Sequence, residues 1–214
     1  MIPRHQKYIF GILLVASLAM GVTLWQLRER AHLRLIAGQD SAHTRAPEVA
    51  PAEQATLLVA NDNDSSLLAQ LHSLPLPADP GARARAVLGK LLDLYAAPDA
   101  AHPVPGGASS VTQVFLLPAP VIGTNAPSRD AQQTGPLLAV VNLTGSFAAS
   151  HPSGIETETL TVLSICGTLH ANLPRVTQVH FLVDGQSRAT LAGHADLTRT
   201  YMAGDAVPAE EAHP

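Results

Sequence analysis

The chain has 214 residues, of which 46% are hydrophobic, 14% charged and only 4% aromatic, so its core is built mainly from aliphatic side chains. This length fits one domain of ordinary size with extensions, and two full domains would be cramped. A net charge of -4 without a clustered basic surface argues against a nucleic-acid partner. The single cysteine, Cys166, excludes an intramolecular disulfide and a multi-cysteine zinc site.

An uncharged apolar segment lies near the N-terminus, at residues 8–27. About 20 helical residues rise roughly 30 Å, enough to span the hydrocarbon core of a bilayer. The segment therefore predicts a transmembrane signal-anchor helix after a short cytoplasmic tail, residues 1–7. Trp25 at its far end fits the headgroup level. Because a folded domain behind a signal-anchor is normally exported, we expect a single-pass protein of the inner (cytoplasmic) membrane with its C-terminal domain outside the cytoplasm.

A cleaved signal peptide is the alternative interpretation of this segment, with Ser17-Leu18-Ala19 as the cleavage site. The apolar residues continue to Leu24, beyond a usual signal-peptide core of about 7–15 residues. No cysteine stands directly after the apolar stretch, which argues against a lipoprotein. Residues 28–54 lack the apolar periodicity of a packed core and are predicted to form a linker.

The folded part begins with two short apolar runs, residues 55–60 and 65–74, which are predicted to pair as a hairpin around the turn at Asn61–Asp64. A helix is predicted from the N-cap Asp79 and Pro80 to a stop at Pro98. Strands are predicted at residues 111–118 and 137–144, joined by an irregular polar excursion over 118–136.

A second helix is predicted after a capping box made by Ser153 and Glu156, and Asn172 and Pro174 are expected to stop it. Its expected buried face comprises Ile155, Thr159, Val162, Leu163, Cys166 and Leu169.

The next strand carries Val179, Phe181 and Val183 on one face and Gln178 and His180 on the other, and ends in an Asp184-Gly185 turn. Residues 202–214 are predicted to be a disordered tail. The expected fold is α/β, an α+β sandwich in which two main helices pack on a small mixed sheet, preceded by one transmembrane helix.

Few side chains suggest catalysis. Cys166 and His170 are four residues apart on a helix, but Cys166 belongs to the apolar stripe, where a free cysteine behaves as a small buried hydrophobe. The spacing of His170, His180 and His194 matches no metal-binding pattern, and nucleophile-elbow and phosphate-loop motifs are absent from the sequence. We therefore expect no enzyme activity, no cofactor and no metal.

The most motif-like polar cluster is Gly193-His194-Ala195-Asp196. A glycine turn with a polar pair bonded to nearby backbone accounts for it better than a catalytic fragment does. Gly185 and Gly193 both suit turns that need a positive φ. Gly185, Gly193, His194 and Asp196 are therefore expected to maintain the fold.

The run LTVLSICGTLHANLPRVTQVHFLVDG, followed closely by Gly193 to Leu197, resembles the GerMN domain of sporulation and spore-germination proteins. In that family a helix ending in a Thr-Leu pair and a proline precedes a strand of the Val-x-x-Val-x-Phe type that ends in glycine. The matching residues here are Thr168, Leu169, Pro174, Val176, Val179, Phe181 and Gly185. Asn142 replaces the acid of the family's Val-Asp-Leu-Ser strand. The resemblance covers about residues 55–201 and is strongest from Leu137 onward.

This resemblance implies an exported, non-enzymatic α/β module, similar in shape to ring-building motifs, that contacts envelope proteins or a second copy of itself. The alternative is a binding protein or hydrolase for cell-wall saccharide or peptide. An enzyme should gather several titratable groups in one concavity, whereas an interaction module should expose apolar or sheet-edge surface beside shallow pockets.

Overall fold

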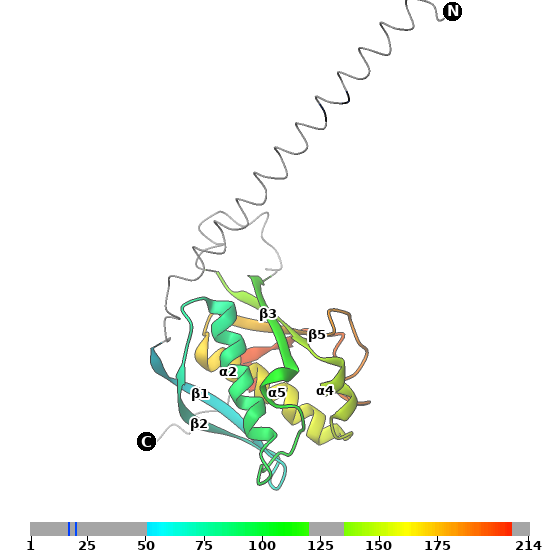
Figure 1. The fold of residues 1–214 in the computed structure, drawn as a ribbon. Helices are drawn as coiled ribbons and strands as arrows, with labels where there is room; N and C mark the ends of the chain where they lie inside the picture. Colours follow the sequence, from blue (N-terminus) through cyan, green and yellow to red (C-terminus); the bar gives the residue numbers. More distant parts are fainter. Residues whose placement is uncertain (1–16, 18–19, 21–50, 120–134, 207–214) are drawn as a thin grey trace, which may run out of the picture. The chain divides into compact units, whose positions relative to one another are not determined.

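The computed structural model describes residues 17, 20, 51–119 and 135–206 (Figure 1). The chain divides into two units, Met1–Val49 and Ala50–Pro214. Among the described residues, no helix has the length and apolarity needed to cross a bilayer. The predicted transmembrane helix at 8–27 falls outside them except for Ser17 and Met20, which are both helical. Residues 1–7, most of the linker and the end of the tail fall outside them too.

The strands of the second unit form two sheets. β1 (Ala52–Asn61) and β2 (Ser66–Pro75) are the predicted antiparallel hairpin. A four-stranded sheet has the order β3-β4-β5-β6, in which β4 and β5 are parallel and the other pairs antiparallel. Its strands are β3 (Val111–Pro118), β4 (Leu137–Leu143), β5 (Val176–Val183) and β6 (Tyr201–Met202). The mixed α/β class is confirmed, with two sheets in place of the expected one.

Two main helices accompany these sheets. α2 (Pro80–Tyr95) starts as predicted, because the Asp79 carboxylate accepts a hydrogen bond of 2.7 Å from the Ala82 N–H. α5 (Ile155–Asn172) is the longer helix. The short helix α4 (Gly145–Ser150) and the 3₁₀ turns η1 (Gly107–Ser110) and η2 (Ala203–Ala206) were not expected from the sequence.

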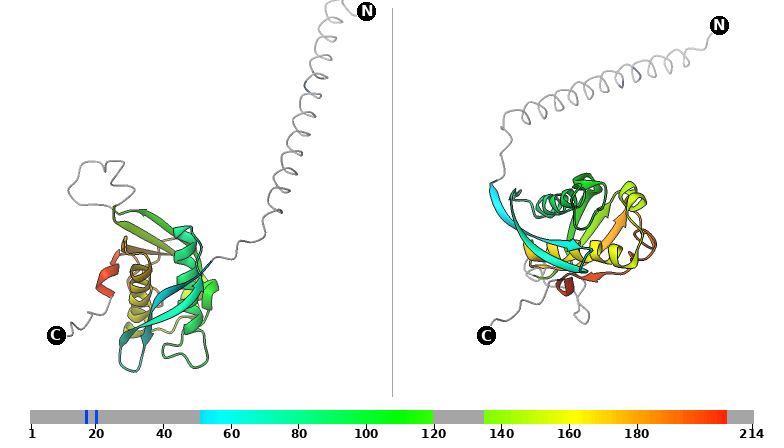
Figure 2. Two further views of the ribbon diagram at one scale, coloured as in Figure 1. Left: turned by 90° about the vertical axis from the view of Figure 1, so that its left-hand side faces the viewer. Right: turned by 90° about the horizontal axis from the view of Figure 1, so that it is seen from below.

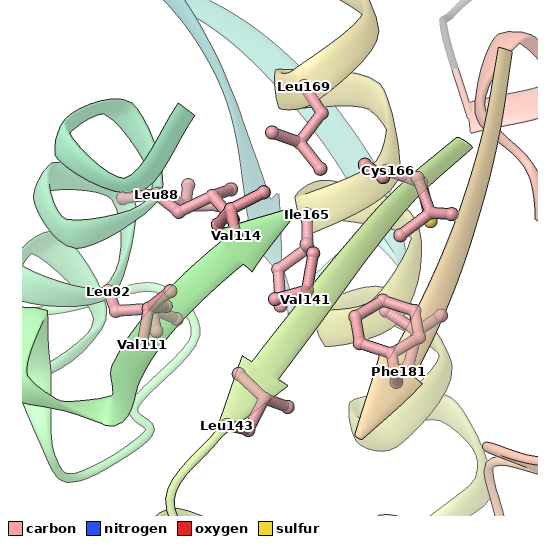
Figure 3. Close-up of a cluster of buried hydrophobic side chains, with 14 of the residues drawn as sticks. Leu88, Leu92, Val111, Val114, Val141, Leu143, Ile165, Cys166, Leu169 and Phe181 are labelled. Carbon is pink, nitrogen blue, oxygen red and sulfur yellow. The ribbon is translucent and has the colours of Figure 1, made fainter. Parts of the chain in front are cut away.

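The predicted buried face of α5 is wrong at two positions: Ile155 is 72% exposed and Thr159 is also exposed. The β1–β2 hairpin packs against α5 on the side away from the four-stranded sheet, so the helix has two covered sides instead of one apolar stripe (Figures 2 and 3). Its buried residues include Leu160, Thr161, Val162, Ser164, Ile165, Cys166, Gly167, Thr168 and Leu169.

The predicted capping box is also wrong. The N-cap of α5 is Gly154, which makes no side-chain capping bond. Glu158, one turn into the helix, accepts a bond of 3.3 Å from the Gly154 N–H. The Glu156 carboxylate instead meets the Ser65 hydroxyl of the hairpin turn. The pattern S-x-x-E correctly predicts that a helix starts here, but Glu158 and not Glu156 bonds back to the main chain.

The folded part is longer at both ends than expected. β1 starts at Ala52, inside the predicted linker of residues 28–54. Met202 belongs to β6, and Ala203 in η2 is fully buried, so the predicted tail of residues 202–214 starts too early. The reason is the pairing of Tyr201 with Val179, which draws this segment onto the sheet.

The core lies between the four-stranded sheet and the helices (Figure 3). Val141, Leu143 and Phe181 of the sheet are buried there with Ile165, Cys166 and Leu169 of α5 and with Leu88 and Leu92 of α2. All of these side chains are at most 1% exposed. The core is mainly aliphatic, as the composition predicts.

Candidate functional site

Glu158 organises the segment that follows β5. Its fully buried carboxylate accepts hydrogen bonds from the main-chain N–H groups of Ala192, His194 and Ala195, at 3.0, 2.9 and 2.9 Å. His194 Nδ1 lies 2.9 Å from the other carboxylate oxygen. Burial alone would raise the pKa of Glu158, but these hydrogen bonds lower it to about 2. Glu158 is thus an ionised anchor whose oxygens are occupied, and it has no free position for acid–base chemistry.

The polar cluster singled out in the sequence lies on this anchored segment. Gly193 has a φ of 129°, and Gly185 has a φ of 74° in the turn after β5, both in the left-handed region that favours glycine. Asp196 accepts bonds from the Thr198 hydroxyl and the Thr198 N–H, at 2.6 and 2.8 Å, and the hydroxyl bond is the main cause of its lowered pKa. The carboxylate therefore serves its local turn.

His194 and Asp196 do not form a relay. In the described part of the chain, no hydrogen bond joins their side chains: His194 faces Glu158 and Asp196 faces Thr198. Ser153 Oγ lies 3.4 Å from His194 Nδ1, which is already beside the Glu158 carboxylate. A serine, a histidine and an acid thus meet here, but the acid and the serine share the same ring nitrogen, so the geometry of a hydrolase triad is absent among these residues.

The remaining family positions lie in the core, at the turn after β5 or just after the end of α5. Asn142 of β4 accepts a bond of 2.7 Å from the Gly185 N–H and so holds the turn after β5. Leu169, Val179 and Phe181 are fully buried, and Pro174 is exposed just after the end of α5.

Side chains close the outer edge of β1. Thr168 Oγ1 accepts a bond of 2.9 Å from the Leu58 N–H, and the Asn172 amide bonds both the N–H and the C=O of Thr56, at 3.0 and 2.6 Å. The Tyr95 hydroxyl accepts a bond of 2.9 Å from the Ala60 N–H. Three N–H groups and one C=O on this edge are therefore bonded by side chains of α2 and α5, although no described strand pairs there.

A second buried polar network was not found from the sequence. His102, fully buried in the loop after α2, places Nδ1 2.5 Å from an Asp62 carboxylate oxygen and Nε2 2.7 Å from Thr161 Oγ1. His151 Nε2 lies 2.8 Å from the same hydroxyl, and His151 Nδ1 lies 2.7 Å from the Pro152 carbonyl. The network joins the hairpin turn to α5 and to the end of α4.

The Thr161 hydroxyl is fully occupied within this network. It lies beside Nε2 of both histidines and also donates to the Thr157 carbonyl at 3.1 Å. The Pro152 carbonyl can only accept, so Nδ1 of His151 donates to it. Burial lowers the pKa of His151. These contacts leave the buried Thr161 hydroxyl no position for a substrate.

The thiol and the other histidines are not brought together. Cys166 is fully buried, and burial raises the pKa of its thiol. His170 Nδ1 donates to the Val176 carbonyl at 2.8 Å instead of facing Cys166. Within the described residues, no group of three or more His, Cys, Asp or Glu side chains could hold a metal ion.

The outer face of the four-stranded sheet is a continuous uncharged surface. The register places Phe115, Val140 and His180 in one row across β3, β4 and β5. The next row adds Met202 of β6. Phe115, Leu117 and Met202 are 45%, 47% and 51% exposed. We call this surface the open face; it comprises Phe115, Leu117, Leu138, Val140, Gln178, His180 and Met202.

Two shallow grooves lie on the surface of the domain. The larger, of about 420 Å³, lies along α2 and is lined by Arg85, Lys90 and Asp93 among others. Arg85 donates to the Val111 carbonyl and Asp93 accepts from the Ala108 N–H, so two of its three charged groups bind main chain. The smaller, of about 200 Å³, lies between Leu163 and Met202.

Comparison with known proteins identifies the family. A crystal structure titled "Putative Lipoprotein from Clostridium perfringens" matches at 18% identity with a TM-score of 0.31, over 76% of this chain and 95% of that one; so low a score carries no argument. Curated proteins give no match. The model of the family Germane, described as "Sporulation and spore germination", matches residues 56–189, more than half of the chain and including Asn142, Thr168 and Phe181. The resemblance predicted from the sequence is thereby confirmed, and the chain belongs to the Germane family.

Proposed function

We propose that this protein is a membrane-anchored, extracytoplasmic Germane module that acts without catalysis, by binding other envelope proteins in a process related to sporulation or germination. The observation that carries the proposal is the open face. Sheets exposed on one side normally alternate apolar residues inward with polar residues outward. On β3 and β4 the outward positions Phe115, Leu117, Leu138 and Val140 are apolar, and polar residues stand outward only in the row at one end of the pair, Gln113 and Asn142.

The composition of the open face matches the centre of a protein interface. Such centres are poor in charged residues and rich in aromatic side chains and methionine. The open face has no charged member and contains both Phe115 and Met202. Contiguous apolar surface of this kind is rare on proteins that act alone. An envelope partner that covers the face would remove these side chains from water.

The polar residues support the same proposal. Glu158, Thr161 and His102 are fully buried and occupied by internal hydrogen bonds. A cell-wall hydrolase or saccharide-binding protein would instead present such groups in a concavity. The groove along α2 is an alternative site, and two of its three charged side chains bind main chain.

The anchor is proposed from residues 8–27 and the orientation from the export of domains behind signal-anchors. A fusion of alkaline phosphatase to the C-terminus tests it. The enzyme is expected to be active there, because it folds only outside the cytoplasm. Activity of a cytoplasmic reporter at the same position would contradict the orientation.

Site-specific photo-crosslinking of the full chain in native membranes tests the interaction surface. A photoreactive residue at position 115 or 117 is expected to give discrete adducts with an envelope protein. The same residue at position 159, exposed on α5, serves as the matched control and should give none. Adducts from position 90, in the α2 groove, with cell-wall fragments, together with none from 115 or 117, would favour the alternative.

A further inference from the structure

β2 is an open edge strand. The hairpin sheet contains only β1 and β2, and side chains already close the outer edge of β1. No described residue bonds to the outer edge of β2, which runs for 10 residues from Ser66 to Pro75. A strand of that length with an unsatisfied edge is a template for pairing with another strand.

The pairing pattern fixes which groups of β2 are free. On β1, Thr56, Leu58 and Ala60 point their N–H groups away from β2. In an antiparallel ladder the odd-numbered residues of β1 therefore bond β2, and Leu57 faces Gln70. The even-numbered residues of β2 are thus used by β1. The main-chain groups of Leu67, Ala69, Leu71 and Ser73 face outward.

The side chains of β2 do not protect this edge. Natural edge strands are usually guarded by charged residues, proline or bulges. The sequence SLLAQLHSLP has no acidic or basic residue apart from a histidine, its proline stands at the very end, and the ladder with β1 has no bulge. Leu71 is 72% and Leu68 50% exposed.

We infer that β2 pairs antiparallel with β2 of a second copy, forming one continuous sheet in the order β1-β2-β2-β1. A second copy fits because an uncharged strand meets itself without like-charge repulsion. Each hairpin has a single open edge, so the contact is isologous and closes at two copies. A chain with both edges open would instead build filaments.

The register follows from the free groups. The outward-facing residues run from Leu67 to Ser73, and their midpoint is Gln70. A two-fold axis at Gln70 pairs Leu67 with Ser73 and Ala69 with Leu71 of the other copy, and all eight residues exchange main-chain bonds. Gln70 then faces its own copy in a non-hydrogen-bonded pair. The open face takes no part, so this dimer stands independently of the proposed partner binding.

Disulfide trapping in the full chain tests the dimer. The Cα atoms of a non-hydrogen-bonded pair are about 4.5 Å apart, within reach of a disulfide. Gln70→Cys is therefore expected to form a disulfide-linked homodimer when membranes are mildly oxidised. Ser73→Cys is the matched control, because six residues of strand place it roughly 20 Å from its own copy. Cys166 is fully buried and remains in both variants.

A charge on the edge gives a second readout. Leu71→Lys in the Gln70→Cys background should reduce the crosslinked dimer at least ten-fold while leaving the unfolding temperature nearly unchanged, because Leu71 is largely exposed. The inference is overturned if Gln70→Cys crosslinks no better than Ser73→Cys, if Leu71→Lys leaves the dimer intact, or if Gln70→Cys is trapped with a different protein.

Discussion

The carboxylate of Glu158 is fully buried and accepts hydrogen bonds from four main-chain N–H groups, whereas Phe115, on the open face of the four-stranded sheet, leaves 45% of its surface exposed. In the first region a polar group is buried and fully satisfied. In the second an apolar group is left in water. No buried side-chain nitrogen or oxygen among the described residues lacks a hydrogen-bond partner. The groups that still lack a contact partner are therefore the exposed apolar side chains of the open face.

This contrast separates fold from function. Buried polar groups that are satisfied from within make the structure specific, because their loss leaves donors or acceptors unpaired. Exposed apolar groups contribute little to stability, and another surface is needed to cover them. Variants of the two regions should therefore fail in different ways.

The largest effect is expected for Glu158→Ala. It leaves the N–H groups of Ala192, His194 and Ala195 without their shared acceptor, which should lower the free energy of unfolding by about 3–5 kcal/mol. Urea unfolding of the full chain in detergent measures it. Glu156→Ala, an exposed neighbour on α5, is the control and should change stability by less than about 1 kcal/mol. Equal losses of unfolding free energy in Glu158→Ala and Glu156→Ala would contradict the stabilising role given to the buried Glu158 carboxylate.

Acid should reproduce much of that loss. The folded pKa of Glu158, about 2, lies below its ordinary value of 4.5, so its contribution is fully present above pH 4.5 and disappears as the pH falls toward 2. The loss amounts to about 3 kcal/mol. The lowered pKa of His151 adds a smaller loss that starts below its ordinary value of 6.5.

A pH series of unfolding curves for Glu158→Gln checks this assignment. The variant should lose most of the dependence between pH 4.5 and 2, retain the part that belongs to Asp196, and keep the dependence that belongs to His151. Persistence of the full acid slope in Glu158→Gln would assign the titration to another group.

A smaller effect is expected for Thr161→Val, which keeps the shape of the side chain but removes the hydroxyl between His102 and His151. Two buried ring nitrogens then lose their partner, at a cost of about 1–3 kcal/mol. Thr159→Val, on the exposed side of the same helix, should cost less than about 1 kcal/mol. Thermal unfolding distinguishes the two, and Thr161→Ser should restore most of the loss.

The smallest effects are expected at His194 and Asp196. The His194 side chain is 41% exposed, and its N–H still bonds Glu158 after His194→Ala, so the loss should be about 1 kcal/mol. Asp196→Ala should lower the melting temperature less, since its carboxylate serves only an exposed turn. Photo-crosslinking from position 115 should be unchanged in both, and its loss with normal melting would return these residues to a functional role.

The order of the main elements, strands β1 to β5 with helices α2 and α5, was predictable because local chemistry specifies it. Asp79 and Pro80 start α2, the alternation of Val179 and Phe181 marks β5, and Asp184-Gly185 ends it. The burial of α5 on two sides was not predictable, because it depends on the hairpin, whose β1 meets the helix from more than 100 residues away. Local periodicity contains no information about such a contact.

The two polar networks were missed for the same reason. Asp62 and His102 are 40 residues apart, and Glu158 meets Ala192 over 34. One signal was present: Glu158 shares a helical face with Thr161 and Ile165, so a charge stood on a side that had to be buried. The sequence VTQVFLLP of β3 gave a signal for the open face: its apolar residues stand at consecutive positions instead of alternating, which places apolar side chains on both faces of the strand.

The most direct test compares two readouts for two full-length variants, Phe115→Ser and Glu158→Gln. Thermal unfolding reports stability, and crosslinking from position 117 in membranes, at temperatures where both variants are folded, reports partner binding. We predict that Phe115→Ser melts within a few degrees of the unaltered chain and loses the partner adduct, whereas Glu158→Gln melts much earlier and retains the adduct. A Phe115→Ser chain that keeps its adduct, or a stable Glu158→Gln chain that loses it, would contradict the separation of fold from function.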